Sequence, residues 1–359
     1  MSENRLVYII RKENEHISDS QKLVTNLVLR HQDIKEIDFK QAIELDFSES
    51  IMLIVDVELD DYQTIMSLKN ILSKPRENNI PLFFIIGTMN RKEIIQAHTL
   101  GATEFISHPV NEKEFTKKLK NIANKSIENS WKSLSKTSEA ALKVSLKIFE
   151  DTFSGAGQGR KLSDKVLGES CELIIEATEK GELSSMLTAI RTHHNYTYRH
   201  SMMVSGYLTA FGLLFGIRNF DLRNLTSCGL VHDIGKALIS QEILNKPGPL
   251  TEDEWTEMKL HPSHSRQVLS DGKFHPDIID GAVHHHERID GTGYPDRLIG
   301  SEVSDMARMV AIADVFSGLT EKRSYKPSMS NLKAYEIMQT MEGHLDLHLL
   351  NAFKPIALG

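Results

Sequence analysis

The chain has 359 residues, a length that predicts two domains, and its 42 basic and 49 acidic side chains give a net charge of −7. This charge argues against a nucleic-acid polymer as the partner, although it leaves room for a local basic pocket that binds one small nucleotide. Cys171 and Cys228 are the only cysteines, too few for a disulfide framework. The sequence shows no signal peptide, and its apolar stretches are far shorter than the ~20 residues of a membrane span. We therefore expect a cytoplasmic protein that does not enter a membrane.

The first 124 residues alternate strand-like and helix-like segments. Short runs rich in β-branched and aromatic residues predict strands, and segments with helical spacing lie between them. The predicted strands are 6–10, 51–57, 81–87 and 104–107, and the predicted helices are 19–30, 62–73, 91–100 and 112–123. Buried strands that alternate with helices indicate an α/β domain with a doubly wound parallel sheet.

Polar residues follow the predicted strands of this region. Asp56 closes the apolar run 51–55, Thr88 follows the next strand, and His108 and Pro109 follow a further one. This arrangement is similar to the receiver domains of two-component signalling. The resemblance implies that Asp56 stands at the phosphoacceptor position.

Two departures from the receiver pattern concern metal and phosphoryl binding. A receiver needs an acidic pair after its first strand to hold Mg²⁺, because a hard cation prefers carboxylate oxygens. Arg11 and Lys12 occupy that place, and His108 replaces the lysine expected before the proline. We therefore predict a degenerate receiver in which Asp56 is not used as a phosphoacceptor, and which acts through homodimerisation or through protein partners.

Residues 125–182 read as a helical linker. The segment 131–153 carries Leu134, Leu142, Leu146 and Phe149 with near-helical periodicity. The glycine-rich segment 154–159 interrupts the pattern, and a second helix is expected over 163–178. These helices could relay between domains, pair between subunits, or merely cap the C-terminal bundle, and the sequence leaves the three open.

The C-terminal region, 183–359, has helical patterning interrupted mainly by the loop 290–302, so an all-α domain is expected. It contains a series of histidines and aspartates, namely His200, His232, Asp233, His261, His285, His286 and Asp314. Imidazole and carboxylate suit divalent transition metals. Seven donors exceed what one ion can use, and one carboxylate shared by two ions would account for the number. The series therefore predicts a binuclear metal site.

Local motifs surround these donors. The pair His232–Asp233 lies in the apolar segment 230–236, the sequence DGTGYP spans 290–295, and ADVF spans 313–316. With these motifs, residues 190–355 closely resemble the HD-GYP family of cyclic dinucleotide phosphodiesterases. The resemblance implies a metal-dependent enzyme that hydrolyses cyclic di-GMP to pGpG, and onward to GMP, with a metal-bridging hydroxide.

The resemblance also implies a role for individual residues. The first of two divalent ions, iron or manganese, would be bound by His200, His232, Asp233 and Asp314. Asp233 would bridge to the second ion, which His261, His285 and His286 would complete. Lys236 would contact the substrate phosphate, and Arg323 and Lys326 would lie near the anionic substrate. Tyr294 could stack on a base or support the metal pocket.

Two positions depart from the family pattern. Tyr196 stands where some members carry a glutamate that supports a third metal, so two ions are favoured. Ser317 stands where members usually carry aspartate, and loss of an outer-shell partner can lower affinity or activity ~10–100-fold. A weakly active or inactive protein that binds cyclic di-GMP as a signalling scaffold, and a hydrolase of another cyclic dinucleotide, therefore remain alternatives.

Overall fold

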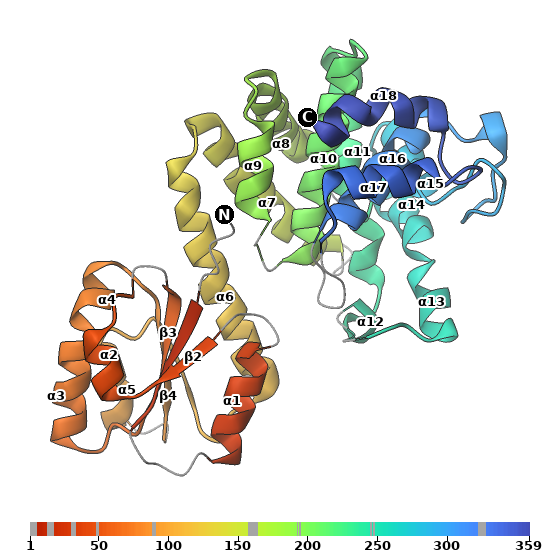
Figure 1. The fold of residues 1–359 in the computed structure, drawn as a ribbon. Coiled ribbons are helices and arrows are strands. Elements are labelled where there is room, and N and C mark those ends of the chain that lie inside the picture. Colours follow the sequence, from red (N-terminus) through yellow and green to blue (C-terminus); the bar gives the residue numbers. More distant parts are fainter. Residues whose placement is uncertain are drawn as a thin grey trace. The chain divides into compact units, whose positions relative to one another are not determined.

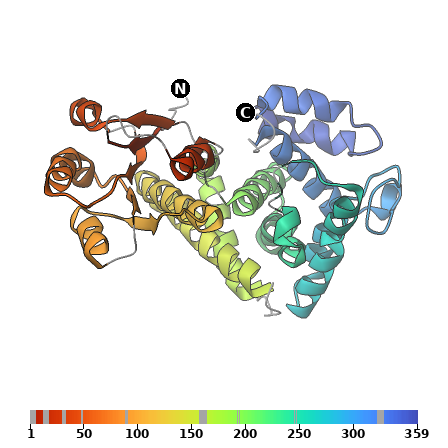
Figure 2. The same ribbon diagram turned by 90° about the horizontal axis from the view of Figure 1, so that it is seen from below.

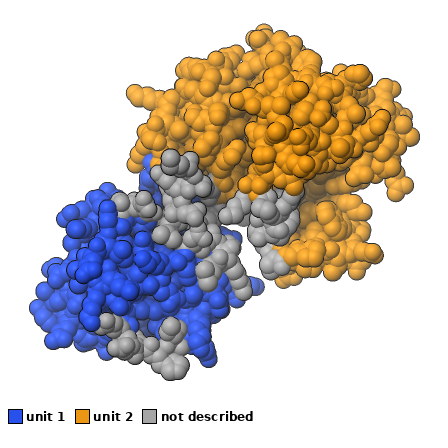
Figure 3. Space-filling view, viewed as in Figure 1, with its two compact units in different colours: residues 1–129 blue, residues 130–359 orange. Residues whose placement is uncertain are grey.

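The computed structural model describes residues 6–12, 18–29, 34–47, 50–87, 91–156, 164–191, 193, 195–244, 246, 248–321 and 328–359. The chain forms two compact units, 1–129 and 130–359, which Figure 3 shows in different colours. Each unit is described by itself below.

The first unit is built on a parallel sheet of five strands. The strands are β1 (Leu6–Ile10), β2 (Ile34–Ile37), β3 (Ser50–Asp56), β4 (Leu82–Ile86) and β5 (Glu104–Ser107), in the order β2-β1-β3-β4-β5. Every neighbouring pair is parallel. Figure 1 shows the sheet with helices around it. This confirms the predicted doubly wound α/β fold.

Helices cover both faces of the sheet. Side chains of α1 (Asp19–Leu29) and α6 (Glu112–Ser130) share one apolar core with alternate strand residues such as Ile54. The opposite core takes the remaining strand residues, such as Val55, and side chains of α2 (Phe39–Glu44), α3 (Tyr62–Ile71) and α5 (Arg91–Thr99). The helix α4 (Ser73–Glu77) follows α3 directly. The period of two along each strand assigns its side chains to the two cores in turn.

The structure adds elements that the sequence patterns did not indicate. The strand β2 and the helix α2 lie in a stretch for which no element was predicted, and α2 begins with a capping box between Asp38 and Gln41. The helix α6 also continues to Ser130, beyond the predicted end at 123.

The second unit is helical, as Figures 1 and 2 show, and its described residues include one isolated β-bridge between Asp290 and Ile299. Its first helices are η1 (Trp131–Ser133), α7 (Lys136–Ala156), α8 (Asp164–Glu179) and α9 (Leu183–Ile190). The next are α10 (Tyr196–Leu214), α11 (Asn219–Val231), η2 (Ile234–Leu238), α12 (Gln241–Leu244), α13 (Glu252–Met258) and α14 (His261–Asp271). The last are α15 (Pro276–His284), η3 (Gly300–Glu302), α16 (Asp305–Thr320), α17 (Asn331–Gln339) and α18 (Leu347–Leu358). The predicted all-α fold of this region is confirmed.

Close packing of two helices places the first donors. A Cβ on Gly229 of α11 would lie 2.5 Å from the Cα of Ser205 on α10, so only glycine allows the two backbones to approach this closely. His200 lies on α10, and His232 follows the last residue of α11. The α10–α11 contact therefore brings these two rings into one region, with their centroids 5.4 Å apart.

Candidate metal centre

The pair His232–Asp233 lies at the junction of α11 and η2. His232 is the C-cap residue of α11, and Asp233 precedes the first residue of η2. Both side chains are buried, with exposed fractions of 0% and 1%. A helix end leaves backbone carbonyls without an intrahelical partner, so a side chain at this position can bond to one of them.

Three histidines use such a carbonyl in the same way. The Nδ1 atom of His232 lies 2.9 Å from the carbonyl oxygen of Gly229. The corresponding distances are 2.7 Å from His261 to Met258, and 2.8 Å from His285 to the carbonyl of Ala282. Because a carbonyl only accepts, each Nδ1 carries the proton and donates it. In its neutral form, each ring then presents the lone pair of Nε2.

These Nε2 atoms are buried without a hydrogen-bond partner among the described residues, and so is Oδ1 of Asp233. Buried polar atoms are normally satisfied, and four such atoms in one place require an explanation. All four can donate an electron pair, and no hydrogen-bond donor among the described residues is directed at them. A cation is the species that would satisfy them together.

The two carboxylate oxygens of Asp233 face different histidines. Oδ1 lies 3.2 Å from Nε2 of His261 and 3.9 Å from Nε2 of His285. Oδ2 lies 3.4 Å from Nε2 of His232 and 4.0 Å from Nε2 of His200. One carboxylate thus joins two sets of donors.

The structure brings together all seven residues that were expected to bind metal. Their donor atoms fall into three groups, and within each group the atoms lie within 4.8 Å of one another. The groups are His200, His232 and Asp314; His261, His285 and His286; and His232, Asp233 and His285. The first two groups correspond to the two predicted ion sites, and the third contains the carboxylate between them.

The two carboxyl groups are held in the charged form. Burial alone would raise the pKa of Asp233, but the Lys236 ammonium and the His232 ring outweigh it and hold that pKa well below its usual range. Burial would also raise the pKa of Asp314, but the hydrogen bond from His200 keeps it well below its usual range. Both side chains are therefore anionic donors at neutral pH.

The histidines differ in their preferred charge. Burial lowers the pKa of His285 to about 3 and brings the pKa of His286 well below its ordinary value, so both rings are neutral. Burial acts in the same direction on His200, but hydrogen bonds with Asp314 and Glu321 raise its pKa to about 9. Neutral imidazole and carboxylate are the donors that divalent transition metals bind, so the residues fit such ions, with His200 releasing a proton when the metal binds.

His200 is held differently from the other ligand candidates. Its Nε2 atom lies 2.9 Å from Asp314, whereas its Nδ1 atom lies 3.0 Å from Oε2 of Glu321 and 3.3 Å from the hydroxyl of Ser317. The ring of Tyr196 stacks on His200, with centroids 5.7 Å apart. A neutral phenol in this place adds no carboxylate to the donor set.

The expected substrate contacts are described in part. Lys236 forms an ion pair with Oδ2 of Asp233 and is partly exposed, so its ammonium lies beside the donor cluster. The ring of Tyr294 stacks on His286 with centroids 4.9 Å apart, which positions that histidine. Arg323 and Lys326 lie outside the described residues.

The loop after His286 is fixed by a residue that the sequence reasoning missed. The buried carboxylate of Glu287 accepts hydrogen bonds from the backbone N–H groups of Asp296, Arg297 and Leu298. A Cβ on Gly293 would lie 2.4 Å from a backbone nitrogen, so the loop requires glycine there. A glutamate directly after three histidines in a buried segment was the signal that could have identified this anchor.

Glu321 was also missed. It is 4% exposed, and its two oxygens contact His200 and the Nε atom of Arg199. The signal was its place four residues after Ser317, which puts both side chains on one face of a helix.

The expected phosphoacceptor position in the first unit is occupied by internal contacts. Asp56 is 2% exposed, and its Oδ2 atom accepts a hydrogen bond from Nε of Arg11 at 3.0 Å. Its Oδ1 atom lies 3.2 Å from Nε2 of His108. Arg11 is itself held by Glu36 at 2.8 Å and by the carbonyl oxygen of Gln21 at 2.9 Å. The guanidinium therefore fills the place next to Asp56 where a receiver would hold a cation.

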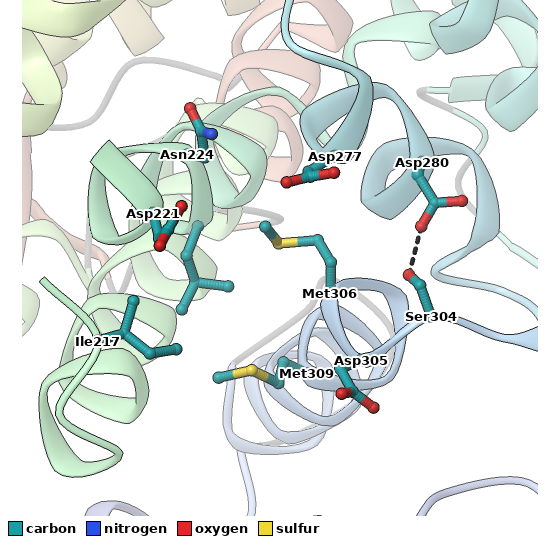
Figure 4. Close-up of a pocket in the computed structure, with 10 residues that line it drawn as sticks. Ile217, Asp221, Asn224, Asp277, Asp280, Ser304, Asp305, Met306 and Met309 are labelled. Atoms are coloured by element: carbon teal, nitrogen blue, oxygen red, sulfur yellow. Dashed lines mark hydrogen bonds between the residues drawn. The ribbon is translucent and has the colours of Figure 1, made fainter. Parts of the chain in front are cut away.

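A separate cavity of about 290 Å³ is lined by residues from the N-terminal parts of α11, α15 and α16 (Figure 4). The donors His232 and His285 instead follow the C-terminal ends of α11 and α15. The lining of the cavity includes Ile217, Asp221, Asn224, Leu225, Asp277, Asp280, Ser304, Asp305, Met306 and Met309. None of the predicted site residues is among them.

Within the described part of the chain, no helix is both long enough and apolar enough to cross a membrane.

Comparisons with known proteins find relatives that are named as cyclic dinucleotide phosphodiesterases. Over 168 residues the chain is 37% identical to a cyclic di-GMP phosphodiesterase of Pseudomonas aeruginosa. This alignment covers 46% of this chain and 41% of the relative. It is 38% identical over 144 residues to a 3′3′-cGAMP-specific phosphodiesterase of Vibrio cholerae, covering 40% and 31%. It is 28% identical over 299 residues to the cyclic di-GMP phosphodiesterase response regulator RpfG of Xanthomonas campestris, covering 82% and 72%.

The first two of these matches span less than half of the relatives' own length. The predicted resemblance to cyclic di-GMP phosphodiesterases is nevertheless confirmed at the level of sequence relationship. The family model described as HD domain matches residues 179–349, which contain all seven clustered donors. Residues 179–349 of this chain are therefore an HD domain.

Proposed function

We propose that this protein is a metal-dependent phosphodiesterase that hydrolyses cyclic di-GMP. The observation that carries the proposal is the position of Asp233, whose two oxygens face two separate sets of histidines. A carboxylate shared between two donor sets would hold two divalent ions close together, as two-metal hydrolytic sites do. We assign His200, His232, Asp233 and Asp314 to one ion, and Asp233, His261, His285 and His286 to the other.

When bound, two such ions supply Lewis acidity toward a phosphate and a water molecule of lowered pKa. The chain's own residues prepare the place for them. The backbone carbonyls at Gly229, Met258 and Ala282 fix the ring orientations of three histidines before any ligand arrives. Lys236 places a cation beside the cluster, where it can offset the charge of a substrate phosphate as a bond to phosphorus breaks.

The substrate is proposed from the relatives. Two of those described above are named as acting on cyclic di-GMP, and one is named as specific for 3′3′-cGAMP. We propose cyclic di-GMP as the substrate, with pGpG as the first product and GMP after a second hydrolysis. The 38% identity to the cGAMP enzyme makes the mixed dinucleotide the second candidate. Side-by-side kcat/KM values for the two dinucleotides would discriminate between them.

Metal-loaded protein is expected to carry about two transition-metal ions per chain, iron or manganese, and to convert cyclic di-GMP to pGpG. Two ions are expected because Tyr196, rather than a carboxylate, lies against His200. Chelation should reduce turnover by about 10²- to 10³-fold, the equivalent of several kcal/mol of lost charge stabilisation. Elemental analysis and chromatography of the products from the same preparation would measure both quantities.

The outcomes of that experiment separate the proposed enzyme from a binding scaffold. Protein that holds two ions and binds cyclic di-GMP tightly, yet leaves it intact, would contradict the enzyme and support the scaffold. Three tightly bound ions would contradict the role given to Tyr196. Restoration of turnover by metal added back after chelation serves as the control.

We further propose that residues 1–124 are a receiver-like domain that works through contacts, that 125–182 are a helical connection, and that 183–359 are the catalytic domain. The ion pair of Asp56 with Arg11 and its contact with His108 support this use of the first domain. Its roles would be homodimerisation or the binding of a protein partner. No step in them requires Asp56 to be phosphorylated.

Incubation with acetyl phosphate is expected to leave the mass, oligomeric state and turnover of the protein unchanged. Attack on phosphorus needs a free carboxylate oxygen and a cation beside it, whereas both oxygens of Asp56 have partners and Arg11 occupies the neighbouring place. Intact-mass spectrometry would detect an acyl phosphate directly. An adduct that forms on the natural chain, is absent from Asp56→Asn, and alters turnover would show that the domain is a working phospho-switch.

A further inference from the structure

His200 differs from three of the other ligand candidates in the group that holds its Nδ1 atom. His232, His261 and His285 each lie at or next to a helix terminus and donate from Nδ1 to a backbone carbonyl three residues earlier. His200 instead lies inside α10, four residues after its first residue. Carbonyls of the preceding turn are used there by the helix itself. His200 must therefore find its Nδ1 acceptor on another element.

Glu321, the C-cap residue of α16, supplies that acceptor. Its Oε2 atom lies 3.0 Å from Nδ1 of His200, and its Oε1 atom accepts from Nε of Arg199 at 3.2 Å. The Glu321 side chain is 2% exposed. An isolated buried carboxylate is strongly unfavourable, and the Arg199 guanidinium supplies the charge partner that Glu321 requires. Arg199 in turn donates to the carbonyl oxygen of His193 at 2.8 Å, which fixes its own position.

Ser317 lies on the same side of His200 as Glu321, but it cannot provide a charged acceptor for the Nδ1 atom of His200. Its hydroxyl lies 3.3 Å from the same Nδ1 atom, and a hydroxyl carries no charge. The backbone N–H of Glu321 donates to the carbonyl oxygen of Ser317 at 2.9 Å, so the two residues are one helical turn apart. The small serine leaves room for the longer glutamate side chain to reach back to the ring.

We propose that Glu321 is the positioning residue that fixes His200 for metal binding, in place of a carboxylate at position 317. A carboxylate on the far nitrogen of a metal-binding histidine fixes its tautomer and makes the other nitrogen a stronger donor. The inference rests on the proposed metal site and adds a residue to it. It also means that Ser317 does not by itself make the site weak.

The test uses the 359-residue chain and titration with Co²⁺, whose visible absorption reports the number of bound ions and their ligand field. In Glu321→Gln and Glu321→Ser we expect about 10- to 100-fold weaker binding of one ion, in competition with a chelator, while the other ion binds as before. The double variant Ser317→Asp/Glu321→Ser moves the carboxylate from position 321 to position 317, one helical turn earlier. It should recover most of the lost affinity and the original absorption spectrum.

Glu302→Gln, an exposed glutamate of the same domain, is the matched control and should bind both ions normally. A merely structural role for Glu321 would lower the thermal midpoint without a site-specific loss of affinity, and the double variant would not restore the spectrum. If the natural protein binds two ions and turns over cyclic di-GMP, but the Glu321 variants bind equally well, the positioning role is wrong and the proposed function stands. If the natural protein binds no Co²⁺, both are wrong.

Discussion

Replacement of Asp233 by alanine is expected to abolish cyclic di-GMP hydrolysis and to remove both metal ions. Its two oxygens face His261 on one side and His232 on the other, so the single change deletes a donor from each ion site. It also leaves the Lys236 ammonium beside the cluster without its anionic partner, which repels an incoming cation. We expect turnover to fall by more than about 100-fold, the upper end for loss of an outer-shell partner alone.

Metal content by elemental analysis and turnover by product chromatography would measure this effect. Asp277→Asn is a matched control, because Asp277 is an exposed aspartate at the start of α15, the helix that leads to His285. That variant should retain two ions and near-normal turnover. An Asp233→Ala protein that keeps its metal and its activity would show that the carboxylate does not join two ion sites.

The ligand candidates could be predicted from sequence because their environment is local. His232 and His285 follow apolar helical segments, and each ring is oriented by a carbonyl only three residues earlier. The side chain, the helix end and the acceptor therefore occur together in one short segment. The sequence of these short segments does not show how close together they lie in the folded chain. The grouping into two ion sites depended on the family resemblance, and the structure shows that the residues do converge.

Residues that act across long sequence separations were harder to foresee. Glu321 reaches His200 from 121 residues away, and no periodicity links the two positions. The positive charge of Arg11 indicated that a magnesium site was impaired. Its direct hydrogen bond to Asp56, 45 residues away, depends on the pairing of β1 with β3 in the sheet.

The missed strand β2 has a different cause. Its sequence, Ile34 to Ile37, places a lysine and a glutamate between two isoleucines, and it lies at the edge of the sheet. Charged residues are usual on edge strands, where one side of the backbone is unpaired. β2 therefore lacks adjacent apolar residues, whereas β5, which is also a four-residue edge strand, was recognised because Phe105 and Ile106 are adjacent in it.

Replacement of Gly235 by alanine is expected to destabilise the second unit and to displace His261 from the metal cluster. Gly235 lies in η2, two residues after Asp233, and its backbone N–H donates to the hydroxyl of Ser265 at 2.9 Å. A Cβ at this position would lie 1.9 Å from the carbonyl oxygen of His261 and 2.5 Å from the backbone nitrogen of Ser265. Both contacts are with backbone, so no change of side-chain rotamer relieves them, and η2 and α14 must move apart.

Such overpacking should cost at least about 3 kcal/mol of unfolding free energy, which corresponds to roughly 6–12 °C in the thermal midpoint for a unit of this size. Because the movement separates His261 from Asp233, metal content should fall as well. Gly206→Ala is the matched control, since a Cβ there would meet only the flexible ends of Leu183, at 2.8 Å, and Leu187, at 3.1 Å. Its midpoint should change by less than about 3 °C, since alanine's higher helix propensity offsets part of the crowding. Calorimetry with metal analysis would measure both effects, and a Gly235→Ala protein as stable and as well loaded as Gly206→Ala would show that η2 does not fix the position of His261.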